Sequence, residues 1–138
     1  LIRRESMRDA LSSFVQEKPV MGTCAGAILL GNQIDDDRVQ CFEVMDLSTR
    51  RNAYGRQVDS FTTDLSISGM GGNAFHAVFI RAPRIESAGK DVEVLASHGD
   101  DAVLARQGHL LAATFHPELS DDTRVHEYFV EMIRNHYA

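Results

Sequence analysis

The spacing of apolar side chains near the N-terminus predicts a helix, a strand and a second helix in close succession. Residues 3–17 carry apolar side chains at intervals of three and four, a helical period that ends at Pro19. The short apolar run 19–23 is typical of a buried strand, and it passes without a linker into the apolar helical segment 25–30. Gly31 follows at the position where glycine commonly caps a helix.

A strand-rich region follows, and the chain closes with another helix. Short runs of strand-forming residues are separated by turns rich in glycine, proline and aspartate, whereas 35–38 is polar and is interpreted as a solvated loop. Residues 122–136 place apolar side chains, Val125 and Met132 among them, on one helical face. This order of elements favours an α/β domain with some antiparallel pairing. The runs predicted to be strands are 44–48, 59–67, 75–81, 92–98, 102–106 and 110–115.

Composition indicates one packed domain with an acidic balance. The chain has 138 residues, of which 43% are hydrophobic, and this fits a single domain over 1–138. The 14 basic and 20 acidic side chains give a net charge of −6 without a Lys/Arg cluster, which argues against nucleic acid as a partner. No apolar run approaches the ~20 residues of a membrane span, so no membrane partner is expected. Two cysteines, Cys24 and Cys41, are too few for a disulfide framework, so a reducing, cytoplasmic setting is expected.

Gly22-Thr23-Cys24-Ala25-Gly26 has the form G-x-C-x-G, the cysteine version of a nucleophile elbow. Such an elbow turns a strand sharply into a helix, and we expect small residues two positions either side because larger ones would collide across the turn. The backbone N–H of Ala25 would point into an oxyanion hole, and the following helix would favour thiolate over thiol at Cys24. The alternative is a glycine-rich turn that holds a buried structural cysteine.

His116-Pro117-Glu118 directly follows the predicted strand 110–115. In an extended stretch His116 and Glu118 would project to the same side, and Pro117 favours that conformation for the residue before it. A carboxylate beside an imidazole selects its tautomer and stabilises the imidazolium, which a Cys–His nucleophile pair requires. Taken alone, the motif fits a solvated pair at a strand end. Together with Cys24, it favours a catalytic site.

These motifs resemble those of the class I (triad) glutamine amidotransferases. Within that superfamily, the chain is similar to the glutaminase subunits of pyridoxal 5′-phosphate synthase. The resemblance extends over essentially the whole chain, and its eleven-residue block 51–61 is more specific than either catalytic motif. The segments that carry it are 51–61 (RNAYGRQVDSF), 79–83 (FIRAP) and 114–122 (TFHPELSDD).

The resemblance implies a fold and a reaction. The fold would be a three-layer, flavodoxin-like α/β domain with a mixed sheet. Cys24 would attack the carboxamide of L-glutamine, His116 would pass a proton to the leaving ammonia, and Glu118 would orient His116. A thioester on Cys24 would then be hydrolysed to glutamate. The ammonia would pass to a partner, a (βα)₈-barrel synthase that builds pyridoxal 5′-phosphate, and the glutaminase subunit itself would need no cofactor.

The resemblance also implies which residues hold the substrate. Arg51 would meet the α-carboxylate end of glutamine, where a guanidinium fork suits a carboxylate. Ile80 and Arg81 would contact glutamine largely through their backbone, and the backbone of Ala25 would serve the oxyanion. No metal is expected, because no pair of histidines shows zinc spacing.

One departure from the family pattern bears on activity. The resemblance implies a strand–helix–strand unit ahead of Leu1, ending in a Gly-Gly-Glu-Ser-like loop that supplies glutamine contacts and a second oxyanion donor. Its absence here implies an N-terminally truncated domain and weak catalysis, because losing one oxyanion donor costs about 10²–10³ in rate. Besides an active glutaminase, two alternatives therefore stand: a catalytically silent interaction module, and an amidotransferase subunit that serves another synthase.

Overall fold

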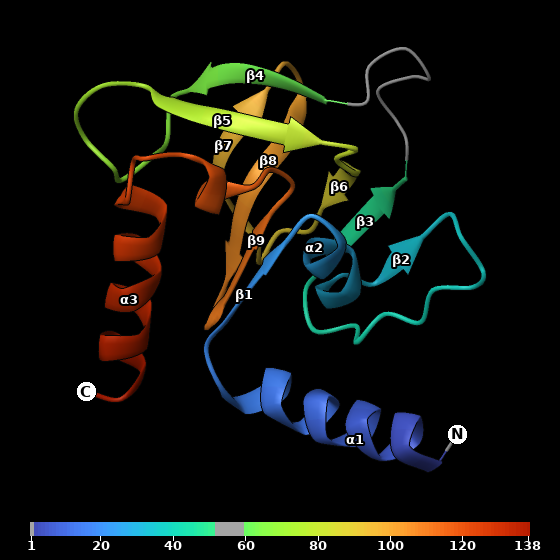
Figure 1. Ribbon diagram of the computed structural model, residues 1–138. Coiled ribbons are helices and arrows are strands. Elements are labelled where there is room, and N and C mark those ends of the chain that lie inside the picture. The colour runs from blue at the N-terminus through green and yellow to red at the C-terminus, as the bar shows by residue number, and fades with distance from the viewer. Residues whose placement is uncertain (1, 52–59) are drawn as a thin grey trace.

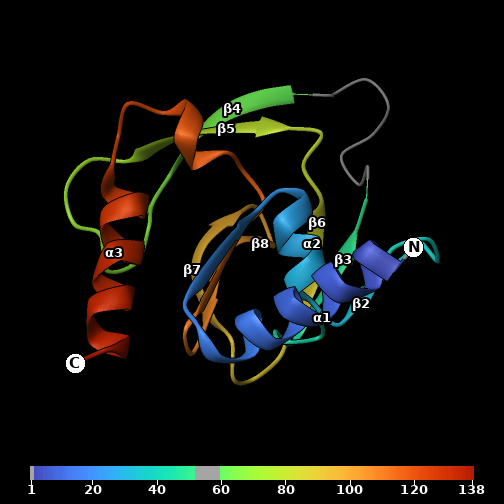
Figure 2. The same ribbon diagram turned by 60° about the horizontal axis from the view of Figure 1, so that its bottom comes forward.

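The computed structural model describes residues 2–51 and 60–138. Helices cover both faces of a mixed sheet, which confirms the predicted α/β class (Figures 1 and 2). The helices are α1 (Ile2–Glu17), α2 (Ala25–Leu30), the 3₁₀ turn η1 (Pro117–Leu119) and α3 (Arg124–His136). The strands are β1 (Val20–Thr23), β2 (Gln33–Ile34), β3 (Leu47–Arg50), β4 (Ser60–Leu65), β5 (Phe75–Ile80), β6 (Arg84–Ala88), β7 (Glu93–His98), β8 (Asp101–Gln107) and β9 (Leu110–Ala113).

Within the described residues, seven strands form the main sheet in the order β1-β9-β8-β6-β3-β2, with β7 paired to β8. β1 runs parallel to β9 and β2 parallel to β3, whereas the other pairs are antiparallel. β4 and β5 form a separate antiparallel hairpin that lies across one end of the sheet (Figure 1). Because β1 and β9 are parallel neighbours, the segments that follow them, Cys24 and 114–116, emerge at the same edge.

Two hydrophobic clusters, one on each face of the sheet, create the three layers. β9 shows the division, because Leu110 and Ala112 face one cluster while Leu111 and Ala113 face the other. The first cluster includes residues of α1 and α2, and the second includes α3 and the β4–β5 hairpin. Figure 2 shows α3 on one side of the sheet and α1 and α2 on the other. This arrangement holds β1 and β9 rigidly between two packed layers.

One predicted strand begins later than expected, and two strands were not predicted. The strand predicted over 44–48 begins only at Leu47, because the backbone N–H groups of Phe42, Val44 and Met45 bond to the last carbonyls of α2. That segment therefore caps a helix instead of extending the sheet. β2 and β6 were not predicted: β2 has two residues, and Pro83 with the 87–89 turn signal obscured β6.

The helix predicted over 3–17 is confirmed as α1, but its apolar stripe is largely unburied. Val15 is buried, whereas Met7, Leu11 and Phe14 are 64%, 48% and 52% exposed. Local periodicity therefore predicted the helix correctly and its packing only in part. None of the described helices combines the length and the apolar composition that a bilayer crossing requires.

Candidate active site

Cys24 occupies a strained turn between β1 and α2, as the pentapeptide predicts. Its φ of 54° and ψ of −111° lie in a region that side-chain-bearing residues rarely adopt. The turn is fixed on both sides, because the N–H of Cys24 donates to the carbonyl of Ala113 at 2.8 Å and its own carbonyl accepts from Ala27 at 3.1 Å. The strain is typical of a nucleophile elbow, where it presents the nucleophile at the end of a strand.

The two glycines of the elbow differ in their steric roles. A Cβ on Gly22 would lie 2.6 Å from the carbonyl oxygen of Gly26 and 2.8 Å from Leu30 Cδ1. A Cβ on Gly26 would meet no atom within 4 Å. The expectation that both positions need small residues is therefore confirmed for Gly22 and wrong for Gly26. Gly26 matters sterically through its backbone, which Gly22 must approach.

This contrast supplies a matched pair of variants. Gly22→Ala should lower the free energy of unfolding by about 3 kcal/mol, the upper end of overpacking costs, because the backbone of α2 would have to move. Gly26→Ala should leave stability unchanged or raise it by up to about 1 kcal/mol, because alanine favours a helix. Urea unfolding followed by circular dichroism measures both. Equal destabilisation of the two variants would contradict this account of the elbow.

His116 and Glu118 form the predicted pair, although by a different geometry. Glu118 Oε1 lies 2.6 Å from His116 Nδ1. The extended stretch expected for them is wrong, because Pro117–Leu119 form a 3₁₀ turn with Pro117 at its start, where proline is favoured. The turn brings the carboxylate back against the ring. Burial acts to raise the pKa of Glu118, but hydrogen bonds from its own backbone and from His116 hold that pKa below its ordinary value.

The end of β5 connects the cysteine to the histidine. The Cys24 thiol donates to the carbonyl of Ile80 at 3.7 Å, and the N–H of His116 donates to the carbonyl of Val78 at 2.9 Å. Carbonyls two residues apart on one strand are separated by about 6–7 Å, so Cys24 and His116 attach to neighbouring points of the same strand. Phe79 between them is fully buried and stacks on Phe61 with ring centroids 4.6 Å apart, which fixes this end of β5.

A small cavity of 260 Å³ opens beside the thiol. This is close to the lower limit of about 300 Å³ for typical ligand pockets, and it suits a ligand of amino-acid size. Arg81, in a left-handed conformation with φ of 45°, follows Ile80 into its wall. His116 and Glu118 do not line the cavity, but the charge of Glu118 acts on the Cys24 thiol. The described residues that line it are Cys24, Ala25, Ile28, Arg51, Arg81 and Pro83.

The electrostatics of Cys24 differ from the expectation of a stabilised thiolate. Burial raises the pKa of the Cys24 thiol above its ordinary value, and the Glu118 carboxylate raises it further. The backbone N–H of Ala25 and the Arg51 guanidinium lower it, but they do not outweigh burial. The short helix α2 therefore does not suffice to make a thiolate in the free site. A base must take the proton when the thiol reacts.

The Glu118→Gln variant tests how charge and burial set the pKa of the Cys24 thiol. It should speed the reaction of Cys24 with iodoacetamide and slow the expected hydrolysis of glutamine. Removing the negative charge should lower the pKa of the Cys24 thiol, which speeds its reaction with iodoacetamide at pH 8 about two- to fivefold. Hydrolysis of glutamine, the reaction that the resemblance implies, should slow, because His116 loses its charged partner. The measurement is the pH profile of carbamidomethylation at Cys24, followed by mass spectrometry. Glu131→Gln on α3 is the control, and an unchanged or raised thiol pKa in Glu118→Gln would refute the assignment.

Sequence reasoning missed several residues around this cavity. Ile28 and Pro83 line it, and Asp35 and Asp36 contact Arg51 from a loop interpreted as solvated. Ile28 is one helical turn after Cys24, and Pro83 is two residues after Arg81, so both are neighbours in sequence of predicted site residues. Asp35 and Asp36 reach Arg51 only through the tertiary fold, and no local signal could have found them. Arg56, Gln57 and Asp59, within the block 51–61 that carries the resemblance, lie outside the described part of the chain.

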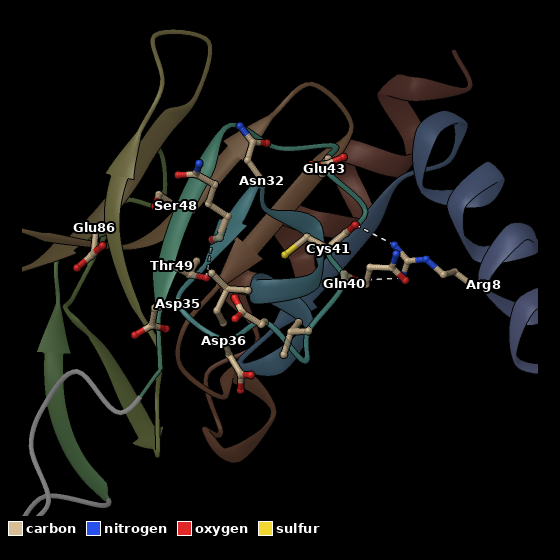
Figure 3. A pocket seen from close by; sticks show the side chains of 14 residues that line it. Arg8, Asn32, Asp35, Asp36, Gln40, Cys41, Glu43, Ser48, Thr49 and Glu86 are labelled. Carbon is tan, nitrogen blue, oxygen red and sulfur yellow. Dashed lines mark hydrogen bonds between the residues drawn. The ribbon is translucent and has the colours of Figure 1, made fainter.

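A larger cavity of 700 Å³ lies elsewhere, beside β2 and β3 (Figure 3). Its lining includes Cys41, whose thiol pKa is raised by burial and by Glu43, and Arg8, which donates to the carbonyls of Gln40 and Cys41. Both cysteines are free thiols. Among residues 2–51 and 60–138, no three histidine, cysteine, aspartate or glutamate side chains gather in a way that could hold a metal ion.

Known proteins resemble this chain over most of its length. It is 50% identical over 135 residues to the pyridoxal 5′-phosphate synthase subunit PdxT of Halalkalibacterium halodurans, an alignment that covers 97% of this chain and 68% of that protein. It is 52% identical over 116 residues to PdxT of Thermotoga neapolitana, which covers 84% of this chain and 62% of the relative. The chain thus spans about two thirds of the length of these relatives.

Solved structures agree with the sequence relatives. A crystal structure of a glutamine amidotransferase superimposes with a TM-score of 0.86 at 45% identity, covering 96% of this chain and 70% of that one. A putative GMP synthase protein from Thermoplasma acidophilum shares the fold alone, with a TM-score of 0.66 at 16% identity over 94% of this chain and 65% of its own. Residues 1–135 match the SNO glutamine amidotransferase family. The chain belongs to that family.

Proposed function

We propose that this protein hydrolyses L-glutamine to L-glutamate and ammonia, with Cys24 as nucleophile, His116 as proton carrier and Glu118 as the group that orients His116. The observation that carries the proposal is the thiol of Cys24 in a strained elbow, attached to the same end of β5 as an imidazole–carboxylate pair. Nucleophile, base and orienting group are the three parts that covalent acyl transfer requires.

The chemistry follows from the geometry. Because Glu118 holds Nδ1 of His116, Nε2 is left to accept the thiol proton as Cys24 Sγ bonds to the carboxamide carbon. The oxyanion that forms would be met by the backbone N–H of Ala25, which follows Cys24 and acts to lower the pKa of its thiol. The C–N bond then breaks, His116 passes its proton to the leaving ammonia, and a thioester remains. Water attacks the thioester, releases glutamate and restores the thiol.

Substrate recognition is assigned to the walls of the small cavity. Arg51 presents a guanidinium whose planar fork suits the α-carboxylate of glutamine. Ile80 and Arg81 would offer backbone groups at the end of β5, where Arg81 adopts a left-handed conformation and lines the cavity. Neither an aspartate nor a glutamate lines the cavity within the described part of the chain, so an anionic substrate end meets no negative wall there.

The ammonia is proposed to serve a partner. The relatives at 50% and 52% identity are named as subunits of pyridoxal 5′-phosphate synthase, so we assign this chain to the same synthesis, in which a (βα)₈-barrel synthase would accept the ammonia. The free thiols are in line with a reducing, cytoplasmic setting. No cofactor takes part in the glutaminase steps themselves.

Product analysis tests the proposal. The protein, alone and mixed with a barrel synthase, should release glutamate and ammonia in equal amounts from L-glutamine, and it should not act on L-asparagine. Absence of turnover in both mixtures, from protein shown to be folded, would overturn the enzyme assignment and favour a silent interaction module. Ammonia production without glutamate would overturn the thioester route.

A further inference from the structure

Two aspartates contact Arg51, which lines the Cys24 cavity. Asp35 and Asp36 lie on the segment after β2, and Figure 3 shows Asp35 beside the end of β3, the strand that Arg51 follows. The N–H of Arg51 donates to Asp35 Oδ1 at 3.1 Å, and Arg51 Nη1 lies 3.4 Å from Asp36 Oδ2. One aspartate therefore fixes the backbone of Arg51 and the other its guanidinium.

Asp36 is well suited to hold the Arg51 guanidinium, because its carboxyl group is ionised and its position is fixed. Its side chain is 12% exposed. Hydrogen bonds from Arg38 hold the pKa of Asp36 well below its ordinary range, with a further contribution from the charge of Arg51. Arg38 binds both carboxylate oxygens, with Nε and Nη2 each at 2.9 Å. Since Arg38 orients the carboxylate, Asp36 is a fixed anion against which Arg51 can rest.

The contact with Asp36 occupies only part of the Arg51 guanidinium. A guanidinium carries five N–H donors, and among the described residues only Nη1 has a side-chain acceptor. Arg51 lines the cavity shared with Cys24 and also the one formed by the segment 35–38. One end of the group is thus held by the loop, while the remaining donors are available to a ligand carboxylate beside the thiol.

We propose that Asp36 is a positioning residue for glutamine recognition, holding the Arg51 guanidinium where the substrate α-carboxylate binds. This inference rests on the proposed glutaminase function. An arginine that is already ordered loses less conformational freedom when it binds a carboxylate. Since the α-carboxylate is bound equally in ground and transition states, losing Asp36 should act on KM and leave kcat nearly unchanged.

Asp36→Asn removes the charge while keeping the size of the side chain. We expect KM for L-glutamine to rise about five- to twentyfold with kcat within about twofold, and Asp36→Glu to recover part of the loss. Asp37→Asn is the matched control, because Asp37 is the exposed neighbouring carboxylate and should leave both constants unchanged. A lowered KM in Asp36→Asn would overturn the proposal and make Asp36 a competitor of the substrate for Arg51.

A second measurement separates positioning from a general structural effect. The inactivation of Cys24 by a chloroketone analogue of glutamine, which carries the α-carboxylate, should show a KI raised by the same factor in Asp36→Asn. Iodoacetamide carries no carboxylate, so its reaction with Cys24 should be unchanged. Equal slowing of both reagents would refute positioning. If the wild-type protein shows neither turnover of glutamine nor saturable labelling by the chloroketone, the proposed glutaminase function is wrong. If the wild-type protein is labelled and the KI of Asp36→Asn equals that of the wild type, only the proposed role of Asp36 is wrong.

Discussion

Replacing Cys24 with alanine should abolish glutamine hydrolysis, with a loss on the order of 10⁴–10⁶ in kcat because no other group can form the acyl intermediate. The fold should survive, because Cys24 contributes backbone bonds to Ala113 and Ala27 that alanine keeps. Ammonia release measured over hours, with protein purified free of contaminating glutaminases, sets the residual rate. A residual rate within tenfold of the wild type would contradict the nucleophile assignment.

Cys24→Gly gives this prediction a second, independent readout. Both variants lack the thiol, but glycine accepts the φ of 54° that strains a residue with a Cβ. Backbone strain of this kind costs about 1–3 kcal/mol, which glycine would relieve. Glycine also loses more conformational entropy on folding, and this offsets part of the stability gained by relieving the strain. The free energy of unfolding of Cys24→Gly should therefore be about 1 kcal/mol higher than that of Cys24→Ala. If Cys24→Ala is the more stable variant, the elbow is not strained.

Replacing His116 with glutamine should slow glutamine hydrolysis by about 10³–10⁴ while the thiol keeps its ordinary reactivity toward iodoacetamide. The reason is that the free site favours the protonated thiol, so attack on a weak electrophile such as a carboxamide needs a base. His136→Gln, an exposed position at the end of α3, is the control and should retain full activity.

The pair His116 and Glu118 should behave as one unit. Because Glu118 contacts the ring of His116 and acts through it, adding Glu118→Gln to His116→Gln should cost little beyond the single His116 change. Steady-state rates of the two single variants and the double variant complete the cycle. Full additivity in ΔΔG‡ would show that Glu118 acts on the substrate independently of His116.

The parts of the site that the sequence predicts are those set by local sterics. The elbow follows from five consecutive residues, because the close approach of Gly22 to the backbone of Gly26 is a property of the turn itself. The His116–Glu118 pair was predicted for an extended segment and is formed by a 3₁₀ turn instead. Proline favours both conformations at that position, and the sequence does not distinguish them.

The parts that the sequence could not predict depend on distant contacts. The Cys24 thiol was expected to be a thiolate, but the burial that raises its pKa comes from the packed cavity and not from the pentapeptide. Asp36 meets Arg51 across 15 positions of sequence, and the segment 42–45 bonds to α2 instead of joining the sheet. The parallel pairing of β2 with β3 brings the segment that holds Asp36 beside Arg51.

Mass spectrometry of the protein treated with a chloroketone analogue of glutamine tests the assignment of Cys24 as the nucleophile of a glutamine-binding site. That assignment requires one adduct, on Cys24, that an excess of L-glutamine prevents and that Cys24→Ala eliminates, while Cys41 stays unmodified. An adduct confined to Cys41, or one on Cys24 that L-glutamine does not suppress, would contradict it.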